Sequence, residues 1–177
     1  MLTESSAPGR DFLAEVCQAW EAEAREAESL GMRVVRLRTG IVLDARGGAL
    51  ARMLPPFRMG LGGRLGSGRQ WMPWIHLDDL AALCRYVLAR PLEGAVNAVA
   101  PSPVTNSEFT RVLGDALHRP AVLPVPAFAL RLALGEMAEM LLASQRVVPE
   151  QAEAAGFQFR FPQLGPALGD VLVPRLR

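Results

Sequence analysis

The chain has 177 residues, half of them hydrophobic, and its 19 basic and 18 acidic side chains leave a formal net charge of +1. This length fits one ordinary domain, or a small domain joined to part of another, and the balanced charge gives no reason to expect nucleic acid or an anionic membrane as a partner. All 19 basic side chains are Arg, so the chain supplies no Schiff-base or general-base lysine.

Cys17 and Cys84 each stand in an apolar, helix-like stretch without a nearby His or second Cys, which predicts buried core thiols. No basic and apolar leader follows Met1. Pro and Arg interrupt the apolar stretch at 121–134, which falls short of the roughly 20 residues of a membrane span. We therefore expect a soluble, cytoplasmic protein.

The first predicted helix is amphipathic and begins near Phe12, with Asp11 as its N-cap and Gly31 as its terminator. Residues 33–43 are rich in β-branched side chains and predict a strand directly after it. A helix followed closely by a strand is one step of an α/β fold. Another short helix, at 49–53, is expected to stop at two prolines.

Five glycines between residues 59 and 73 predict an ordered loop whose backbone passes close to a ligand or to another segment. As a phosphate cradle the loop lacks a Gly-Lys-Ser/Thr ending and a strand–turn–helix setting. A strand-like Trp-Ile-His-Leu follows, then a helix at 78–90 capped by Asp78 or Asp79, and a short strand at 95–99.

Thr105 and Glu108 form a capping box for a helix at 106–118. The remaining expected elements are a strand-like segment at 121–125, an apolar helix at about 127–143, a short helix at 149–155, an aromatic strand-like segment at 157–161 and a final helix. No strand with a Gly-rich phosphate turn opens the chain, so we expect an α/β domain that lacks its first strands.

The run at 68–79 concentrates chemically versatile side chains. Arg69 is suited to a phosphate or carboxylate, Gln70 to a sugar-like hydroxyl, and Trp71 to stacking on a ring. In the alternative interpretation the Trp residues belong to the core, His76 bonds to backbone, and one of the following Asp residues caps the helix.

His76 next to acidic residues also admits a hydrolase-type triad or a metal site. Ser67 is near, but no nucleophile elbow surrounds it. The only other histidine, His118, is 42 residues away. Both hypotheses are therefore weak, and we expect no metal.

Three segments together resemble the second half of the NAD-dependent epimerase/dehydratase branch of the short-chain dehydrogenases/reductases: RVVRLRTGIVLDARGGAL, PPFRMGLGGRLGSGRQWMPWIHLDDLA and GAVNAVAPSPVTNSEFTRVLGDALHRP. In that family a Gly-x-Gly-x-Gln loop precedes an Ile-His-Val-Asp-Asp helix start, followed by an Asn-containing strand and a Pro-Val-Thr-x-x-Glu cap. The counterparts here are Gly66, Gly68, Gln70, residues 75–79, Asn97 and residues 103–108. The FLAEVC-x-x-WE helix and the chain's ending resemble an atypical subgroup with a small C-terminal domain of unassigned role.

The resemblance implies an α/β fold: the C-terminal half of a Rossmann-type doubly wound parallel sheet with a small, mainly helical C-terminal domain. We place the Rossmann part at 1–117, with a substrate-side loop at 58–75, the small domain at 118–167 and a tail at 168–177. The resemblance also implies NADP or NAD as the cofactor. Its nicotinamide and ribose are expected beside the strand end that contains Arg38, Thr39, Gly40 and Val42. Arg38 has a structural ion pair as its alternative role. The implied substrate-binding residues are Arg69, Gln70, Trp71 and His76.

The family's proton-transfer pair, a Tyr followed four residues later by a Lys, is absent. Tyr86 is the single Tyr, and Arg90 stands four residues after it. Alignment through Glu21 places Leu13 and Cys17 at the two positions, and another register places Phe12 and Val16 there.

The resemblance therefore implies an NAD(P)-dependent epimerase- or oxidoreductase-like protein for a sugar- or nucleotide-sugar-like substrate. The alternatives are a catalytically silent NAD(P)-binding sensor and a truncated, nonfunctional fragment. We expect a small-molecule partner and self-association through an exposed sheet edge.

Overall fold

The computed structural model describes residues 1–173, so the end of the predicted tail, residues 174–177, lies outside the described residues. The helices are α1 (Phe12–Ser29), α2 (Gly48–Arg58), α3 (Leu77–Ala89), α4 (Asn106–Leu117), α5 (Ala127–Leu134), α6 (Met137–Leu142), α7 (Glu150–Ala154) and α8 (Leu164–Leu172). The strands are β1 (Val35–Thr39), β2 (Ile41–Leu43), β3 (Trp71–Met72), β4 (Trp74–His76), β5 (Gly94–Ala98) and β6 (Val104–Thr105).

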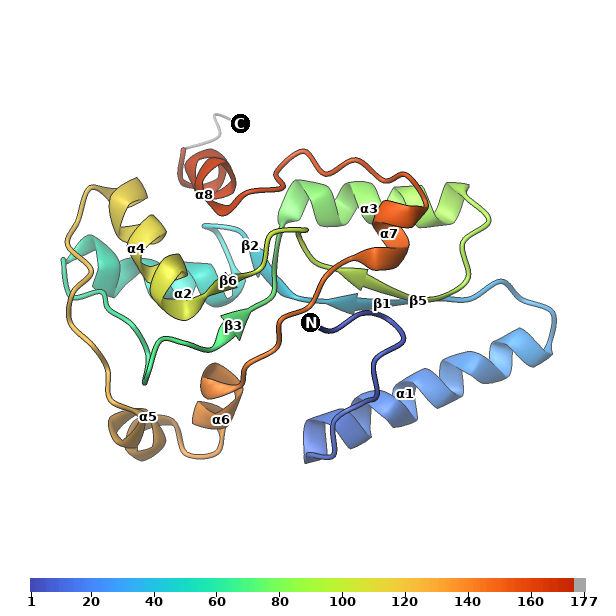
Figure 1. Ribbon diagram of the computed structural model, residues 1–177, viewed down its shortest axis with the longest axis horizontal. Helices are drawn as coiled ribbons and strands as arrows, with labels where there is room; N and C mark the ends of the chain where they lie inside the picture. Colours follow the sequence, from blue (N-terminus) through green and yellow to red (C-terminus); the bar gives the residue numbers. More distant parts are fainter. Residues whose placement is uncertain (174–177) are drawn as a thin grey trace.

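The strands pair as short ladders. β1 runs parallel to β5, in a register that places Val35 opposite Gly94 and Thr39 opposite Ala98. β2 runs parallel to β4, and β3 runs antiparallel to β6. Helix α3 covers one face of the β1–β5 pair and α1 lies on the other (Figure 1). Parallel strands between helical layers confirm the predicted α/β class.

Two apolar clusters hold these layers together. The first joins α2, α4 and α8 to the β2–β4 pair; its largest buried members are Leu43, Leu50, Leu54, Phe57, Trp74, Phe109, Leu113, Phe161, Leu164 and Leu168. The second fills the space between β5, α3 and α7; its members are Ile75, Leu83, Val87, Val96, Ala98, Ala152 and Phe157. The C-terminal residues therefore contribute to both cores and are not an appendage.

Helix α1 contributes to neither core, because none of its residues is buried. Asp11 caps it as predicted, through Ala14 N–H, and Gly31 follows its end with a φ of 79°. Its side chains Phe12 and Trp20 are exposed to solvent. The prediction that Cys17 is buried is wrong for the same reason: Cys17 is exposed, and Cys84 on α3 is only half-buried. Within residues 1–173, β1 has no strand partner other than β5.

The single strand predicted at 33–43 is two strands that change partner at Gly40. The Gly40 N–H donates to the Ala98 carbonyl, and the next N–H, of Ile41, donates to Pro73. A Cβ at Gly40 would lie 2.8 Å from the Pro73 carbonyl oxygen and 2.9 Å from Val99 Cγ1. The change of partner depends on this close approach, which local β propensity does not encode.

The helix predicted to stop before Pro55–Pro56 instead runs through both, from Gly48 to Arg58. Proline in a helix interior removes a backbone hydrogen bond. Here Leu50, Leu54 and Phe57 lie on one helix face and are all buried, so core packing offsets that loss.

Three further expectations change in the C-terminal region. The long helix at 127–143 is two helices, α5 and α6, which separate at Gly135 with a φ of 58°. The segment at 121–125 forms only an isolated bridge between Val125 and Leu65. The aromatic segment at 157–161 is not a strand: Phe157 N–H donates to the Ala152 carbonyl, and the N–H groups of Arg160 and Phe161 donate to the Asp79 side chain on α3.

The capping box at Thr105 is confirmed on its N-cap side, where Thr105 Oγ1 accepts from Glu108 N–H. The expected Asp cap of α3 is wrong: His76 is the N-cap residue, and its Nδ1 accepts from Asp78 N–H at 3.0 Å. No helix within residues 1–173 has the length and apolar character needed to cross a membrane.

Candidate functional site

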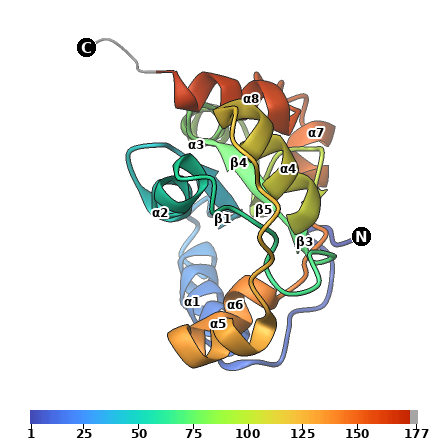
Figure 2. The ribbon, with the colours of Figure 1, turned by 90° about the vertical axis from the view of Figure 1, so that its left-hand side faces the viewer.

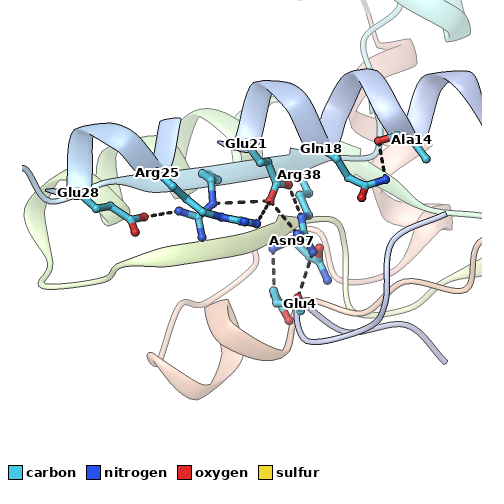
Figure 3. Close-up of polar contacts among 9 residues, drawn as sticks. Glu4, Ala14, Gln18, Glu21, Arg25, Glu28, Arg38 and Asn97 are labelled. Carbon is cyan, nitrogen blue, oxygen red and sulfur yellow. Dashed lines mark hydrogen bonds and ion pairs between the residues drawn. The ribbon is translucent and has the colours of Figure 1, made fainter. Parts of the chain in front are cut away.

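Glu21 ties α1 to β1. Its carboxylate accepts two hydrogen bonds from Arg38, from Nε at 2.6 Å and from Nη2 at 2.9 Å (Figure 3). Arg36, on the same face of the strand, lies 3.6 Å from Glu21 and also pairs with Glu28. Hydrogen bonding from Arg38 lowers the pKa of Glu21, and the same contact raises the pKa of Arg38. Both groups are therefore held in their charged forms.

Arg38 also reaches the N-terminal segment, where its Nη1 donates to the Glu4 carbonyl at 3.0 Å. The structural ion pair that the sequence left open as an alternative thus exists. The Arg38 guanidinium is thus already bonded to Glu21 and to the Glu4 carbonyl, and its contact with a cofactor stays a prediction.

Glu4 closes the carboxyl end of β5. One carboxylate oxygen accepts from Asn97 N–H at 2.9 Å and from Gln151 N–H at 3.3 Å. The Asn97 side chain in turn donates to the Val148 carbonyl at 3.0 Å. The N-terminal segment and the residues before α7 therefore meet at the end of this strand, where ligands bind in open α/β sheets.

The other predicted cofactor residues differ in accessibility. Thr39 is exposed at the end of β1, whereas Val42 is half-buried within β2. Gly40 is packed against Pro73 and Val99, so its missing side chain makes room for protein. Ile41 N–H donates to the Pro73 carbonyl at 2.8 Å, which brings the predicted cofactor segment against the loop that carries the predicted substrate residues.

Two of the predicted substrate residues are neighbours with different environments. Arg69 is exposed, and its guanidinium has no acidic partner among residues 1–173. Gln70 is buried, and its Nε2 donates to the Leu65 carbonyl at 3.0 Å and the Leu141 carbonyl at 3.4 Å. Gln70 therefore joins the loop to α6.

Trp71 lies against residues 144–148, which we call the strap. Its N–H donates to Ser144 Oγ at 3.1 Å, and its carbonyl accepts from Gln145 N–H at 3.3 Å. The Arg146 guanidinium lies over the indole, 4.4 Å from the ring centroid. Arg146 could not be singled out from the sequence, because it stands in the connection between α6 and α7 without a motif around it.

His76 is buried at the start of α3. Its ring stacks on Phe161 with centroids 4.0 Å apart, and Nε2 faces Asp170 Oδ2 at 3.3 Å. Ligand atoms of His76, Asp78 and Asp170 lie within 4.8 Å of one another. However, Nδ1 accepts from Asp78 N–H, which places the proton of the neutral ring on Nε2. A metal ion would need that nitrogen's lone pair, so the geometry favours a proton facing Asp170 over a cation.

Asp79, next in the motif, has a separate structural task. It is 2% exposed, and its two carboxylate oxygens accept from Arg160 N–H and Phe161 N–H, both at 2.9 Å. The Ile-His-Leu-Asp-Asp run therefore clamps the C-terminal segment onto α3. The single tyrosine, Tyr86, adds to this attachment by donating to the Ala155 carbonyl at 2.6 Å.

The Gly-rich loop follows α2 and leads into β3, and its glycines face protein. A Cβ at Gly63 would lie 1.6 Å from the Leu123 carbonyl oxygen, and one at Gly68 would lie 2.1 Å from Ser107 Oγ. Of the two interpretations of this loop, close approach to another segment is the one observed.

The chain is similar in sequence to several known proteins. The profile of a domain of unknown function, DUF1731, matches residues 125–171. An epimerase family protein of Mycobacterium tuberculosis is 48% identical over 171 residues, covering 96% of this chain and 57% of that protein. Epimerase family protein SDR39U1 of Mus musculus is 49% identical over 164 residues, covering 92% of this chain and 56% of that protein. The chain thus spans little more than half the length of these relatives.

Solved structures show a similar fold. The crystal structure of human SDR39U1 (isoform 2) with NADPH superposes with a TM-score of 0.90 at 41% identity, covering 96% of this chain and 58% of that chain. The nucleoside-diphosphate sugar epimerase from Corynebacterium glutamicum gives 0.75 at 36% identity, covering 97% and 33%. The UDP-glucose 4-epimerase of Thermus thermophilus, in complex with NAD, gives 0.67 at 20% identity, covering 88% and 51%, and shares the fold.

The fold and these likenesses define the class: over almost its whole length the chain is similar to part of the Rossmann-type epimerases and dehydratases, in line with the atypical short-chain dehydrogenase/reductase family. Within that class its relatives are the proteins named epimerase family protein SDR39U1, and it carries a DUF1731 domain. A relative in Arabidopsis thaliana is named chloroplastic, so a cytoplasmic location stays a prediction.

Proposed function

We propose that the chain forms the substrate-side part of an NAD(P)-dependent epimerase- or oxidoreductase-like protein acting on a sugar- or nucleotide-sugar-like molecule. The observation that carries the proposal is the Ile41–Pro73 hydrogen bond, which joins the predicted cofactor segment 38–42 to the predicted substrate segment 69–76. Both segments meet where β1 ends, on the edge of a parallel sheet that binds ligands in this kind of fold.

NAD or NADP fits this edge in part. Thr39 is exposed there and is the residue we expect to contact the nicotinamide side of the cofactor. Gly40 and the glycines of the loop at 60–68 pack on protein, so we expect residues outside this chain to hold the phosphates. The NADPH-bound human relative, of which the chain covers 58%, supports this division. The cofactor, when bound, supplies hydride chemistry; this chain's residues orient the substrate and exclude water.

Among the predicted substrate residues, Arg69 and Trp71 are the ones we expect to touch the molecule. Arg69 is exposed without an acidic partner, and Trp71 is half-buried with a ring suited to stacking. Gln70 and His76 use their polar atoms within the protein, and we expect them to fix the shape of the loop.

Isothermal titration of the polypeptide at its natural full length, with NADPH and NADH, tests the proposal. We expect heat with at least one of the two, and weaker binding in Thr39→Val. Ser29→Ala, at the far end of α1, is a matched loss of a hydroxyl group and should bind as the parent does. If neither nucleotide gives heat on titration, the proposal is contradicted.

A catalytically silent cofactor sensor is the second candidate. Leu13 and Cys17, which alignment through Glu21 places at the positions of the absent proton-transfer pair, are exposed and lack the Tyr and Lys chemistry of that pair. Tyr86 is engaged with Ala155 and does not replace them. A screen of nucleotide sugars that gives turnover, lost in Arg69→Ala, would exclude the sensor; cofactor binding without turnover of any of them favours it.

A further inference from the structure

We propose that Arg146 on the strap is a ligand-binding residue that holds a phosphoryl group. The inference rests on the proposed function, because it names the chemistry of the molecule bound at the same edge of the sheet. It adds a residue from the DUF1731 domain to a site otherwise built from the Rossmann part.

Hydrogen bonds hold the strap on three sides, so the position of Arg146 is set without a ligand. Leu2 N–H donates to the Arg146 carbonyl at 2.7 Å, and Val148 N–H donates to the Leu2 carbonyl at 3.0 Å. On the opposite side Gln145 N–H donates to the Trp71 carbonyl at 3.3 Å. Asn97 then ties Val148 to the carboxyl end of β5. In Figure 1 the strap is the orange segment that passes from α6 toward α7, beside the N-terminus.

The guanidinium of Arg146 is free for an anion. It lies over the Trp71 indole, so a cation–π contact holds it while its N–H donors stay unused by acidic groups. Arg146 is exposed and has no carboxylate partner among residues 1–173. Arg131 of the same domain, in contrast, donates to Glu139 at 2.8 Å. A held but unpaired guanidinium suits bidentate binding of a phosphoryl group.

Arg69, two residues before Trp71 in the chain, is a second exposed arginine of the same loop. The Gly68 and Gln70 carbonyls accept from Ser107 N–H and Asn106 N–H, which hold this part of the loop against the start of α4. Arg69 is exposed and Trp71 is half-buried, whereas Gln70 between them is buried. Two guanidinium groups beside an indole suit a phosphorylated molecule that also carries a planar ring.

Inorganic pyrophosphate is the probe that tests the anion site, by calorimetric titration of the full-length protein. We expect Arg146→Ala to weaken its binding by roughly tenfold or more, since charge-assisted hydrogen bonds are lost. Arg146→Lys keeps a cation for the Trp71 ring, and hence the strap, but lacks the planar fork; it should still weaken binding several-fold. Arg52→Ala on α2, an exposed arginine with the same change of charge, should bind as the parent does. Binding unchanged in a folded Arg146 variant, or absent from the parent, overturns the inference.

NADPH titration of the same variants identifies the source of the phosphoryl group. NADPH affinity that is unchanged in Arg146→Ala, with pyrophosphate binding lost, assigns the group to the substrate. A parallel loss of NADPH affinity assigns it to the cofactor. Pyrophosphate binding that depends on Arg146, in a protein that ignores both nicotinamide nucleotides, would leave the anion site standing and overturn the proposed function.

Discussion

Helix α1 and the segment from α7 to α8 both show apolar side chains at regular spacing, yet the molecule uses them differently. In α1, Phe12 and Trp20 are 75% and 70% exposed. In the C-terminal segment, Phe157 and Phe161 are 7% and 8% exposed and belong to the two cores. Figure 2 shows α1 apart from the helices above the sheet, whereas α7 and α8 lie on them. Amphipathic spacing indicates which face is apolar, but the partner decides whether that face is buried.

The attachments of the two regions differ in the same way. The C-terminal segment is held by buried backbone hydrogen bonds to Asp79 and by apolar packing. Helix α1 is held by charged side chains, chiefly Glu21 with Arg38 and Arg36. Partly exposed ion pairs contribute little, so we expect α1 to be the less firmly attached region.

Removing the Asp79 carboxylate should produce the largest effect, on the C-terminal side of the comparison. Asp79→Ala leaves Arg160 N–H and Phe161 N–H without an acceptor, which we expect to cost about 3 kcal/mol or more of the free energy of unfolding. Asp79→Asn keeps one oxygen acceptor and should cost less. Urea denaturation measures both. Equal stability of Asp79→Ala and the parent would contradict the clamp.

Gly63→Ala tests the close approach between the Gly-rich loop and the segment at 123–125. The new methyl group would meet the Leu123 carbonyl and displace the segment at 123–125, at a cost of about 2 kcal/mol. Gly169→Ala in α8 is the matched change, because no atom lies within 4 Å of its Cβ position. It should stabilise the protein by roughly 0.5–1 kcal/mol through helix propensity. The thermal unfolding midpoint should therefore fall in Gly63→Ala and rise in Gly169→Ala. A rise in both variants would contradict the close approach of Gly63 to Leu123.

Glu21→Gln should lower stability by about 1 kcal/mol, as expected of an ion pair near the surface. Because the pKa of Glu21 in the folded chain lies below its ordinary value of 4.5, its contribution is present above pH 4.5 and is lost as pH falls through the folded-state pKa. The variant should lose that part of the pH dependence. Denaturation at neutral and acidic pH measures it, with Glu23→Gln, exposed on the same helix, as the control. An identical pH profile in parent and Glu21→Gln would show that the pair does not stabilise the fold.

Trp20→Ser should have the smallest effect on stability, less than about 0.5 kcal/mol, because the side chain is already exposed. Its effect should appear in association. Sedimentation of the 177-residue chain should show less self-association in the variant than in the parent, since the open apolar face becomes smaller. A monomeric parent would show that α1 and the free side of β1 do not drive association.

Features set by neighbouring residues were predictable from the sequence. The Asp11 and Thr105 caps and the β-branched run before Gly40 depend on local contacts, and all are found. Features set by distant residues were not predictable. The change of partner at Gly40 requires Pro73. His76 caps α3, and Asp79, one of the two expected caps, instead bonds to the backbone of residues 160–161.

The candidate site follows the same rule. The motif at 68–79 identified a segment rich in useful side chains, and Ile41 and Pro73 bring that segment to the strand ends. Which of its side chains remain accessible depends on the small domain: Gln70 bonds to Leu141, and Trp71 lies under Arg146. No local pattern marks that contact, since the strap lies about 70 residues further along the chain.

The two edges of the β1–β5 pair differ, and the difference limits how copies of the chain can join. At Asn97 the outer edge of β5 is capped by the Glu4 carboxylate, which accepts from the backbone N–H, whereas within residues 1–173 the other side of β1 has no strand partner. Growth into a continuous ribbon requires two open edges on every copy. Two copies of the 177-residue chain that paired through β1 would therefore present only the capped β5 edges to a third copy.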